Sequence, residues 1–232
     1  MKPLVGVASP AFLFENEKTN LDIYRFSNNY GKRLYEAGGI PVGILPYDGR
    51  VPDGVLDMFD AFVICGGTQM WPHHFQVVEH ALKHNKPLLG ICLGMQTIHR
   101  YFKYKDWADA QGYTGDLFAF YQEHCSDPAY TTLVELDGHY KAMLRGRENE
   151  AKHRVNLEEG SHIAQLVGND HLFAATVHHY CAFEPSSRLR VTGYAEDGTI
   201  EVIEYGEKVL GVQFHPEMDD TLMPLFSFLI NK

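Results

Sequence analysis

Long apolar runs and basic clusters are both absent from this sequence. No stretch reaches the roughly 18 apolar residues that a membrane-spanning helix requires. The first residues, MKPLVGVASP, lack the apolar core and cleavage site of a signal peptide. The 30 acidic residues outnumber the 20 basic ones, which gives a formal net charge of -10. We therefore expect a cytoplasmic protein that binds neither nucleic acid nor membranes.

The sequence also has few cysteines, and its four stand far apart. They form no C-x-x-C pair, which excludes a zinc ribbon and a thioredoxin-type redox motif. His80 and His84 have a spacing that can bind zinc on a helix, but the sequence places no third ligand beside them. We therefore predict neither a metal ion nor a cofactor.

Short apolar runs alternate with helical patterns over the first hundred residues. We predict strands at Leu4–Ala8, Pro41–Leu45, Ala61–Cys65 and Pro87–Ile91, and helices at Phe26–Ala37, at Phe75–His84 and from just after Cys92. Strands that are apolar throughout are typical of a parallel sheet buried on both faces. The pattern predicts a Rossmann-like, flavodoxin-like α/β fold, with helices on both faces of a mostly parallel sheet.

The second half of the chain has a different character. Tyr101–Asp127 is rich in aromatic residues and receives no assignment, and the charged stretch Glu148–Glu159 is expected to be a surface segment. Nearer the C-terminus we predict an antiparallel hairpin of Leu189–Ala195 and Thr199–Tyr205 around an Asp-Gly turn, a third strand at Val209–Phe214 and a closing helix at Pro224–Ile230. Since no linker or repeat interrupts the chain, residues 1–232 are predicted to form a single domain.

Cys92 is the strongest candidate for a catalytic residue. It lies in the pattern G-x-C-x-G, between an apolar strand and a predicted helix. A nucleophile on such a tight strand-to-helix turn needs glycines two residues away on either side, here Gly90 and Gly94. The free N–H groups at the start of the helix favour the thiolate. The alternative is a buried structural cysteine, and the strand–helix setting argues against it.

His215 and Glu217 are candidates for the base and its orienting carboxylate. They close the run VLGVQFHPE, in which a strand delivers His215 at its end. A cysteine nucleophile needs a nearby proton acceptor, and an imidazole works best when a carboxylate fixes its tautomer. Taken alone, the His-Pro-Glu run could also be a surface turn.

Together the two motifs, GICLGMQ and later VQFHPE, resemble the class I glutamine amidotransferase superfamily. Further stretches narrow the resemblance to its γ-glutamyl-γ-aminobutyrate hydrolase family, peptidase C26: Tyr30–Pro46, His153–Gly168, the run VHH at 177–179, and Tyr194–Glu204. The resemblance covers most of the chain, with a gap at about 101–150. It implies a class I glutamine amidotransferase-like fold and hydrolysis through a γ-glutamyl thioester on the cysteine.

The resemblance also assigns roles by position. It implies a triad of Cys92 as nucleophile, His215 as general base and acid, and Glu217 as its orienter. The oxyanion hole would be formed by the backbone N–H groups of Gly67 and Leu93. The residues implied in substrate binding are Gly66, Gln96, His178, His179 and Tyr180. Tyr180 stands where the family commonly has glutamine, so we expect an altered pocket there.

The sequence therefore predicts a hydrolase that cleaves a γ-glutamyl amide or isopeptide bond in a small molecule. Two alternatives remain: a glutaminase subunit that supplies ammonia to a partner synthase, and a non-catalytic binding protein on the same scaffold. A homodimer is also left open. In the loop after Gly67, Trp71 packs on substrate or on the protein, and His73 and His74 either line the site entrance or form an exposed pair.

Overall fold

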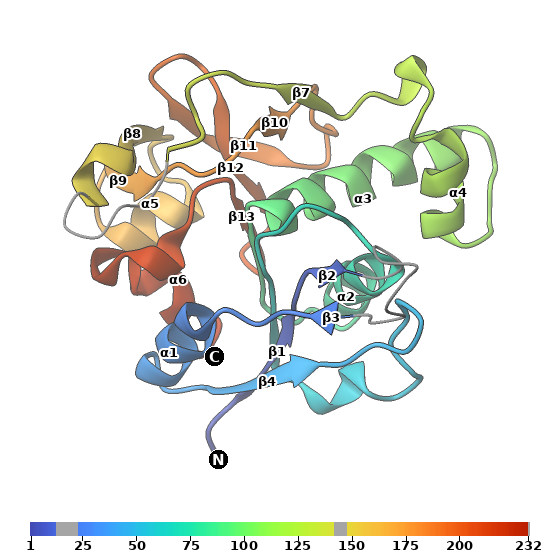
Figure 1. Cartoon of the computed structure of the whole chain (residues 1–232), viewed down its shortest axis with the longest axis horizontal. Helices are drawn as coiled ribbons and strands as arrows, with labels where there is room; N and C mark the ends of the chain where they lie inside the picture. The colour runs from blue at the N-terminus through green and yellow to red at the C-terminus, as the bar shows by residue number, and fades with distance from the viewer. Residues whose placement is uncertain (13–22, 142–147, 232) are drawn as a thin grey trace.

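The computed structural model, which describes residues 1–12, 23–141 and 148–231, is built around a nine-stranded sheet (Figure 1). The strand order is β4-β1-β5-β6-β13-β12-β11-β8-β9. Pairing is parallel from β4 through β6 to β13 and antiparallel from β13 to β9. The predicted mostly parallel sheet with a C-terminal antiparallel region is confirmed.

The strands of the large sheet are β1 Leu4–Ala8, β4 Ile40–Ile44, β5 Ala61–Ile64, β6 Leu88–Ile91, β8 Lys152–Leu157, β9 His171–Ala175, β11 Arg190–Ala195, β12 Ile200–Tyr205 and β13 Val209–Val212. Two small sheets pair β2 Ala11–Phe12 with β3 Ile23–Tyr24 and β7 Leu133–Glu135 with β10 Tyr180–Ala182. The α-helices are α1 Asn28–Glu36, α2 Pro72–Lys83, α3 Leu93–Ala110, α4 Leu117–His124, α5 His162–Val167 and α6 Pro224–Ser227.

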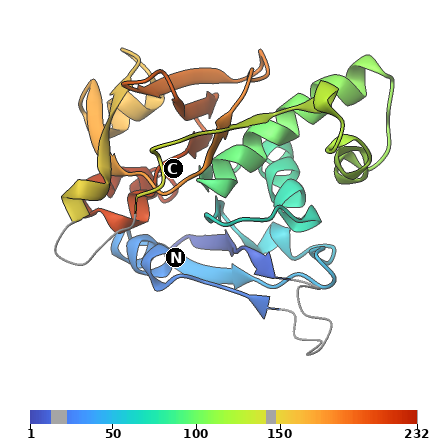
Figure 2. The ribbon, with the colours of Figure 1, turned by 45° about the horizontal axis from the view of Figure 1, so that its top comes forward.

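Helices cover both faces of the sheet, as predicted (Figure 2). One apolar cluster lies under α1, α5 and α6 and includes Leu34, Ile163 and Phe226. A second lies under α2 and α3 and includes Phe75 and Met95. Each cluster packs on one face of the central strands, which explains why those strands are apolar throughout.

One sequence prediction of the second half was wrong, and one stretch that had no assignment now has one. The stretch Glu148–Glu159 is not a surface segment, because it contains β8, where Val155 has no exposed surface. Its charged residues alternate with apolar ones, so one side of the strand is buried while the other holds the charges. The unassigned stretch Tyr101–Asp127 holds the second half of α3 and the whole of α4.

The sheet brings the candidate catalytic residues to one edge. Cys92 directly follows the carboxyl end of β6, and Gly66 and His215 come two and three residues after the ends of its sheet neighbours β5 and β13. Because parallel strands end at the same edge, these three residues must lie close together. The fold itself therefore assembles the site.

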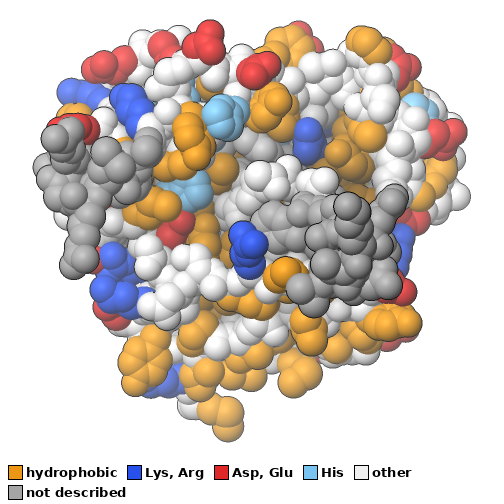
Figure 3. Space-filling model, viewed as in Figure 1, with side chains coloured by type: hydrophobic (Ala, Val, Ile, Leu, Met, Phe, Trp, Pro, Cys, Tyr) orange, Lys and Arg blue, Asp and Glu red, His pale blue; other side chains and the backbone are white. Residues whose placement is uncertain are grey.

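The outer edge of the sheet carries exposed apolar side chains. Around β4 they include Ile40, Val42 and Leu45, and Figure 3 shows apolar side chains gathered in the region where Figure 1 places β4.

In the described part of the chain, no helix is both long and apolar enough to cross a membrane. The single domain and the homodimer stay predictions.

Candidate active site

Cys92 lies on a strained turn between β6 and α3. Its backbone has φ 52° and ψ −103°, a combination that non-glycine residues rarely adopt. Its N–H donates to the carbonyl of Val212 on β13 (2.8 Å), which anchors the turn to the sheet. Strain at a single residue that the surrounding structure enforces is typical of a functional position.

The two glycines of the G-x-C-x-G pattern are required by close packing. A Cβ on Gly90 would lie 2.6 Å from the backbone of Gly94. A Cβ on Gly94 would lie 2.2 Å from the carbonyl oxygen of Ile64 on β5. Both separations are shorter than the non-bonded contacts that a Cβ atom makes in proteins, so no larger residue fits at either position without moving the turn.

His215 connects the cysteine to the carboxylate. Its Nδ1 lies 2.8 Å from Oε1 of Glu217, and the Cys92 side chain is near enough to raise its pKa. All three side chains are buried. Burial alone would lower the pKa of His215, but the negative charge of Glu217 and the contact with Cys92 outweigh it and raise that pKa well above its ordinary value. The geometry therefore suits an imidazolium beside a thiolate.

The predicted oxyanion hole has suitable donors. Leu93 is the first residue of α3, so its N–H has no acceptor within the helix. A Cβ on Gly67 would lie 3.1 Å from Cδ2 of Leu93, so the loop after β5 packs against the first residue of α3. Within the described residues, neither N–H donates a hydrogen bond to another group.

The backbone N–H of Gly66 already has a partner inside the protein. It donates to the hydroxyl of Tyr30 on α1 (3.0 Å), so this N–H is not free to bind a substrate. Burial, followed by the nearby charge of Glu217, raises the pKa of Tyr30 well above its ordinary value. The hydroxyl therefore stays protonated, and Tyr30 fixes the loop against the triad. No sequence signal predicted this role of Tyr30.

We expect the substitution Gly66→Ala to damage the site without unfolding the protein. The new Cβ would lie 2.8 Å from Cε1 of His215 and 3.4 Å from Cβ of Cys92, so the imidazole must shift. Misplacing a catalytic group in this way lowers kcat/KM by about 100-fold. The control is Gly31→Ala, where the nearest atom is 4.0 Å away and activity should be kept. Equal activity of the two variants would contradict the prediction.

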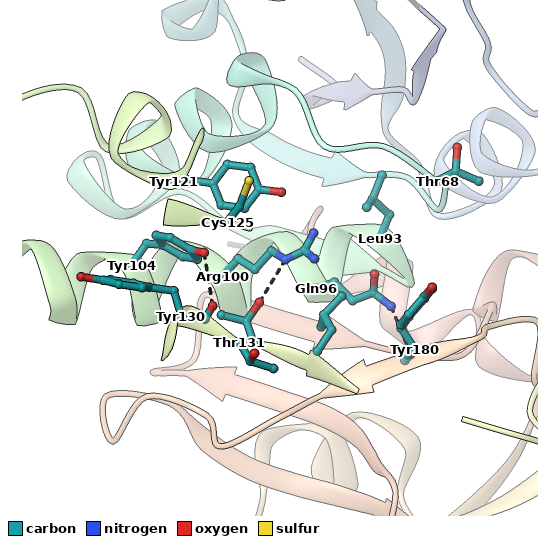
Figure 4. A pocket seen from close by; sticks show the side chains of 12 residues that line it. Thr68, Leu93, Gln96, Arg100, Tyr104, Tyr121, Cys125, Tyr130, Thr131 and Tyr180 are labelled. Atoms are coloured by element: carbon teal, nitrogen blue, oxygen red, sulfur yellow. Dashed lines mark hydrogen bonds between the residues drawn. The ribbon is translucent and has the colours of Figure 1, made fainter. Parts of the chain in front are cut away.

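A pocket of about 260 Å³ lies along α3, and Leu93, the residue after Cys92, lines it (Figure 4). Leu93 and Gln96 line one end, Arg100 lies in the middle, and Tyr104 and Tyr130 line the other end. The side-chain amide of Gln96 donates to the carbonyl of Tyr180 and to the side chain of Gln213, both at 3.2 Å. Gln96 and Tyr180 thus line a pocket next to Cys92, as the resemblance implied.

Arg100 is a pocket residue that the sequence analysis missed. Its Nε donates to the hydroxyl of Thr132 (3.2 Å), and its guanidinium lies over the ring of Tyr121. No carboxylate among the described residues lies within ion-pair distance of it. A signal was available, because Cys92, Gln96 and Arg100 are spaced four residues apart and so share one face of a helix.

Two predicted substrate residues do not line this pocket. His178 is buried and faces Glu201, and its Nδ1 donates to the carbonyl of Tyr180 (3.1 Å). His179 is exposed and stacks on Tyr140, with ring centroids 4.2 Å apart. Alternation along an extended segment sends neighbouring side chains to opposite sides, so all three could not face one pocket.

Both alternatives that the sequence analysis gave for His73 and His74 were wrong. His73 and His74 neither line an entrance nor form an exposed pair, because both are fully buried and each has Nε2 3.2 Å from the carbonyl oxygen of Ser9. The indole N–H of Trp71 donates to the carbonyl of Ala11, so Trp71 packs on the protein.

His80 and His84 do have a third potential ligand. The structure brings Asp57 beside them, which the sequence could not show because Asp57 lies on a separate segment. Asp57 and His84 are exposed, so water competes strongly for these positions.

Comparison with known proteins gives consistent results. The peptidase C26 family model matches residues 3–80 and 73–217. The glutamine amidotransferase-like protein RP404 of Rickettsia prowazekii is 26% identical over 93% of this chain and 91% of its own. The CTP synthase of Treponema pallidum is 32% identical over 74% of this chain and 31% of the synthase.

A solved structure has the same fold. The glutaminase domain of the Trypanosoma brucei CTPS, determined with bound acivicin, superimposes with a TM-score of 0.66 at 15% identity, covering 98% of this chain and 91% of that one. Since the family model spans most of the sequence, the assignment rests on more than the fold. The chain belongs to the peptidase C26 family of the class I glutamine amidotransferase superfamily, whose members hydrolyse C–N bonds.

Proposed function

We propose that this protein is a cysteine hydrolase that cleaves γ-glutamyl amide or isopeptide bonds in small molecules. The observation that carries the proposal is the pairing of a Cys92–His215–Glu217 constellation with a neighbouring pocket that contains the cation Arg100. A γ-glutamyl group has a reactive carbonyl at one end and an α-carboxylate at the other. It is therefore complementary to a thiol at the start of α3 and a guanidinium farther along the same helix.

The chemistry follows from the positions of the groups. The Cys92 thiolate attacks the γ-carbonyl carbon, and the N–H groups of Leu93 and Gly67 stabilise the resulting oxyanion. His215 gives its proton to the leaving amine as the C–N bond breaks, which leaves a γ-glutamyl thioester. His215 then takes a proton from water, whose oxygen attacks the thioester, and glutamate leaves as the thiolate reforms.

The spacing along α3 supports Arg100 as the partner of the glutamyl α-carboxylate. Eight residues of helix separate the backbones of Cys92 and Arg100 by about 12 Å. Helical side chains lean toward the N-terminus, so the guanidinium lies closer to Cys92 than its backbone does. Figure 4 shows it directed toward Leu93 and Gln96. A γ-glutamyl chain attached to Cys92 is of the right order of length to reach it.

The main alternative is a glutaminase subunit that passes ammonia to a synthase. Both functions need the same triad and the same glutamyl pocket, so these features do not separate them. They differ in leaving group, because glutamine releases only ammonia whereas a γ-glutamyl hydrolase must release an amine or a peptide. The choice of substrate therefore decides between the two.

The test is glutamate release from glutamine, γ-glutamyl-GABA, γ-glutamyl-putrescine, glutathione and a γ-Glu-Glu peptide, with Cys92→Ala alongside. Turnover of a compound other than glutamine that is lost in the variant is the expected result. Turnover of glutamine alone would favour the glutaminase alternative. Turnover of nothing in the panel would contradict the proposed function.

Arg100→Met is expected to weaken every γ-glutamyl substrate alike. Losing a hydrogen bond to a charged group costs about 1.5–3 kcal/mol, so kcat/KM should fall about 10- to 100-fold, mainly through a higher KM. Lys103→Met is the matched control, because Lys103 lies on the same helix over the ring of Trp107 and not in the pocket. A loss confined to substrates with an acidic leaving group would show that Arg100 binds the other product.

A further inference from the structure

Outside the pocket, three histidines converge on one buried carboxylate. Glu201 on β12 has no exposed surface. Its Oε1 lies 3.6 Å from Nδ1 of His139, 3.4 Å from Nε2 of His153 and 3.3 Å from Nε2 of His178. His139 and His178 are buried, and His153 is largely so. The four residues come from four separate segments of the chain, so only the fold brings them together.

The hydrogen bonds on the far side of two rings fix their tautomers. Nε2 of His139 lies 2.8 Å from a carboxylate oxygen of Asp197, and Nδ1 of His178 lies 3.1 Å from the carbonyl oxygen of Tyr180. Both acceptors require an N–H, so in a neutral ring the inner nitrogen carries a lone pair. Two inner lone pairs would then face the charge of Glu201, and the cluster needs a positive charge to offset this repulsion.

The inner atoms do not form hydrogen bonds with one another. Among the residues the structure describes, Nδ1 of His139, Nε2 of His153, Nε2 of His178 and both oxygens of Glu201 have no hydrogen-bond partner. The carboxylate of Glu201 is thus fully buried in a site where its own hydrogen-bonding capacity is unused.

The separations indicate which kind of positive charge fits. A charge-assisted bond from an imidazolium to a carboxylate is about 2.7–2.9 Å long, which is shorter than all three separations. Nitrogen and oxygen ligands held about 2.0–2.1 Å from a tetrahedral ion lie about 3.3 Å apart, close to the distances of the histidine nitrogens from Glu201. The ligand atoms of His139, His153 and Glu201 all lie within 4.8 Å of one another, so these three residues could share one ion.

We propose that His139, His153 and Glu201 bind a divalent transition-metal ion of the zinc type, with His178 beside the carboxylate. The donor set of two imidazoles and one carboxylate suits zinc. Asp197 acts as the outer partner that orients His139, and the Tyr180 carbonyl holds His178 against Glu201. Because the same carbonyl also accepts from Gln96 of the pocket, the ion would hold the pocket wall in place and take no part in the reaction.

The test uses the tag-free full chain, stripped with a chelator and titrated with Zn²⁺ or Co²⁺. The background substitution His84→Ala removes the exposed group of Asp57, His80 and His84. We expect one Zn²⁺ per chain and the visible spectrum of tetrahedral Co²⁺. In this background Asp197→Asn, which leaves all three ligands intact, should weaken zinc binding about 10- to 100-fold. His153→Gln, which removes a ligand, should weaken it further.

Two results would overturn the proposal. One is the absence of stoichiometric Zn²⁺ binding by the stripped protein while its circular dichroism spectrum shows it folded. The other is Zn²⁺ affinity that His153→Gln leaves unchanged. In either case the cluster is an ion pair between protonated histidines and Glu201, and the thermal midpoint should then rise on acidification with no response to zinc.

Discussion

Replacing Cys92 with alanine is expected to lower kcat/KM for the γ-glutamyl substrate by about 10⁴-fold or more. The reason is that the covalent route is lost entirely, while only the oxyanion donors and the binding pocket remain. Glutamate release over time measures the effect. Cys125→Ala is the control, because Cys125 also lines the pocket but lies at its far end, beside Tyr121. Comparable activity of wild type and Cys92→Ala would remove the thiol from the mechanism.

Replacing Cys92 with glycine should remove activity but relieve the strain of its backbone. The backbone of Cys92 holds a strained conformation, φ 52° and ψ −103°, that costs a non-glycine residue about 1–3 kcal/mol. Glycine accepts these angles freely but loses more entropy on folding. Cys92→Gly should therefore be inactive and yet, by urea denaturation, about 1 kcal/mol more stable than Cys92→Ala. Equal stabilities would indicate that the turn carries no strain.

Local sequence signals were sufficient for the parallel half of the fold. The strands β1, β5 and β6 are apolar throughout, and the glycines around Cys92 specify a turn with no alternative packing. Such features depend on neighbours within a few residues. They could be predicted because the residues that form the sequence pattern are the same residues whose local packing requires it.

Features set by long-range contacts were missed or misassigned. β8 looked like a surface segment because its charges are conspicuous, and only pairing with β9 and β11 reveals that its other face is buried. His178 looked like a substrate residue, although its direction is set by Glu201 on β12. Asp57 lies beside His80 and His84 in the structure but far from them in the sequence, so the spacing of residues along the chain did not reveal it.

The substitution Glu217→Gln should both slow the enzyme and change its pH dependence. Glutamine keeps the shape of the side chain but removes the charge that favours the imidazolium of His215. By analogy with other triads, kcat/KM should fall by about 10²- to 10⁴-fold. The backbone carbonyl of Glu217, which accepts from Arg33 (3.2 Å), is unaffected by the change, so the local fold should persist.

The direction in which the pH profile of kcat/KM shifts follows from the negative charge of Glu217 beside His215. Glu217 raises the pKa of His215, so its neutralisation lowers that pKa and the imidazolium loses its proton at a lower pH. Since the leaving amine needs this proton, the alkaline limb of the kcat/KM profile should move to lower pH.

Glu204→Gln is the matched control for this experiment. Glu204 is another buried carboxylate, and it accepts from the Ile163 amide (2.9 Å), away from the triad. Its neutralisation should reduce stability while leaving the alkaline limb in place. An alkaline limb that stays fixed in Glu217→Gln, or moves equally in both variants, would show that Glu217 does not set the protonation of His215.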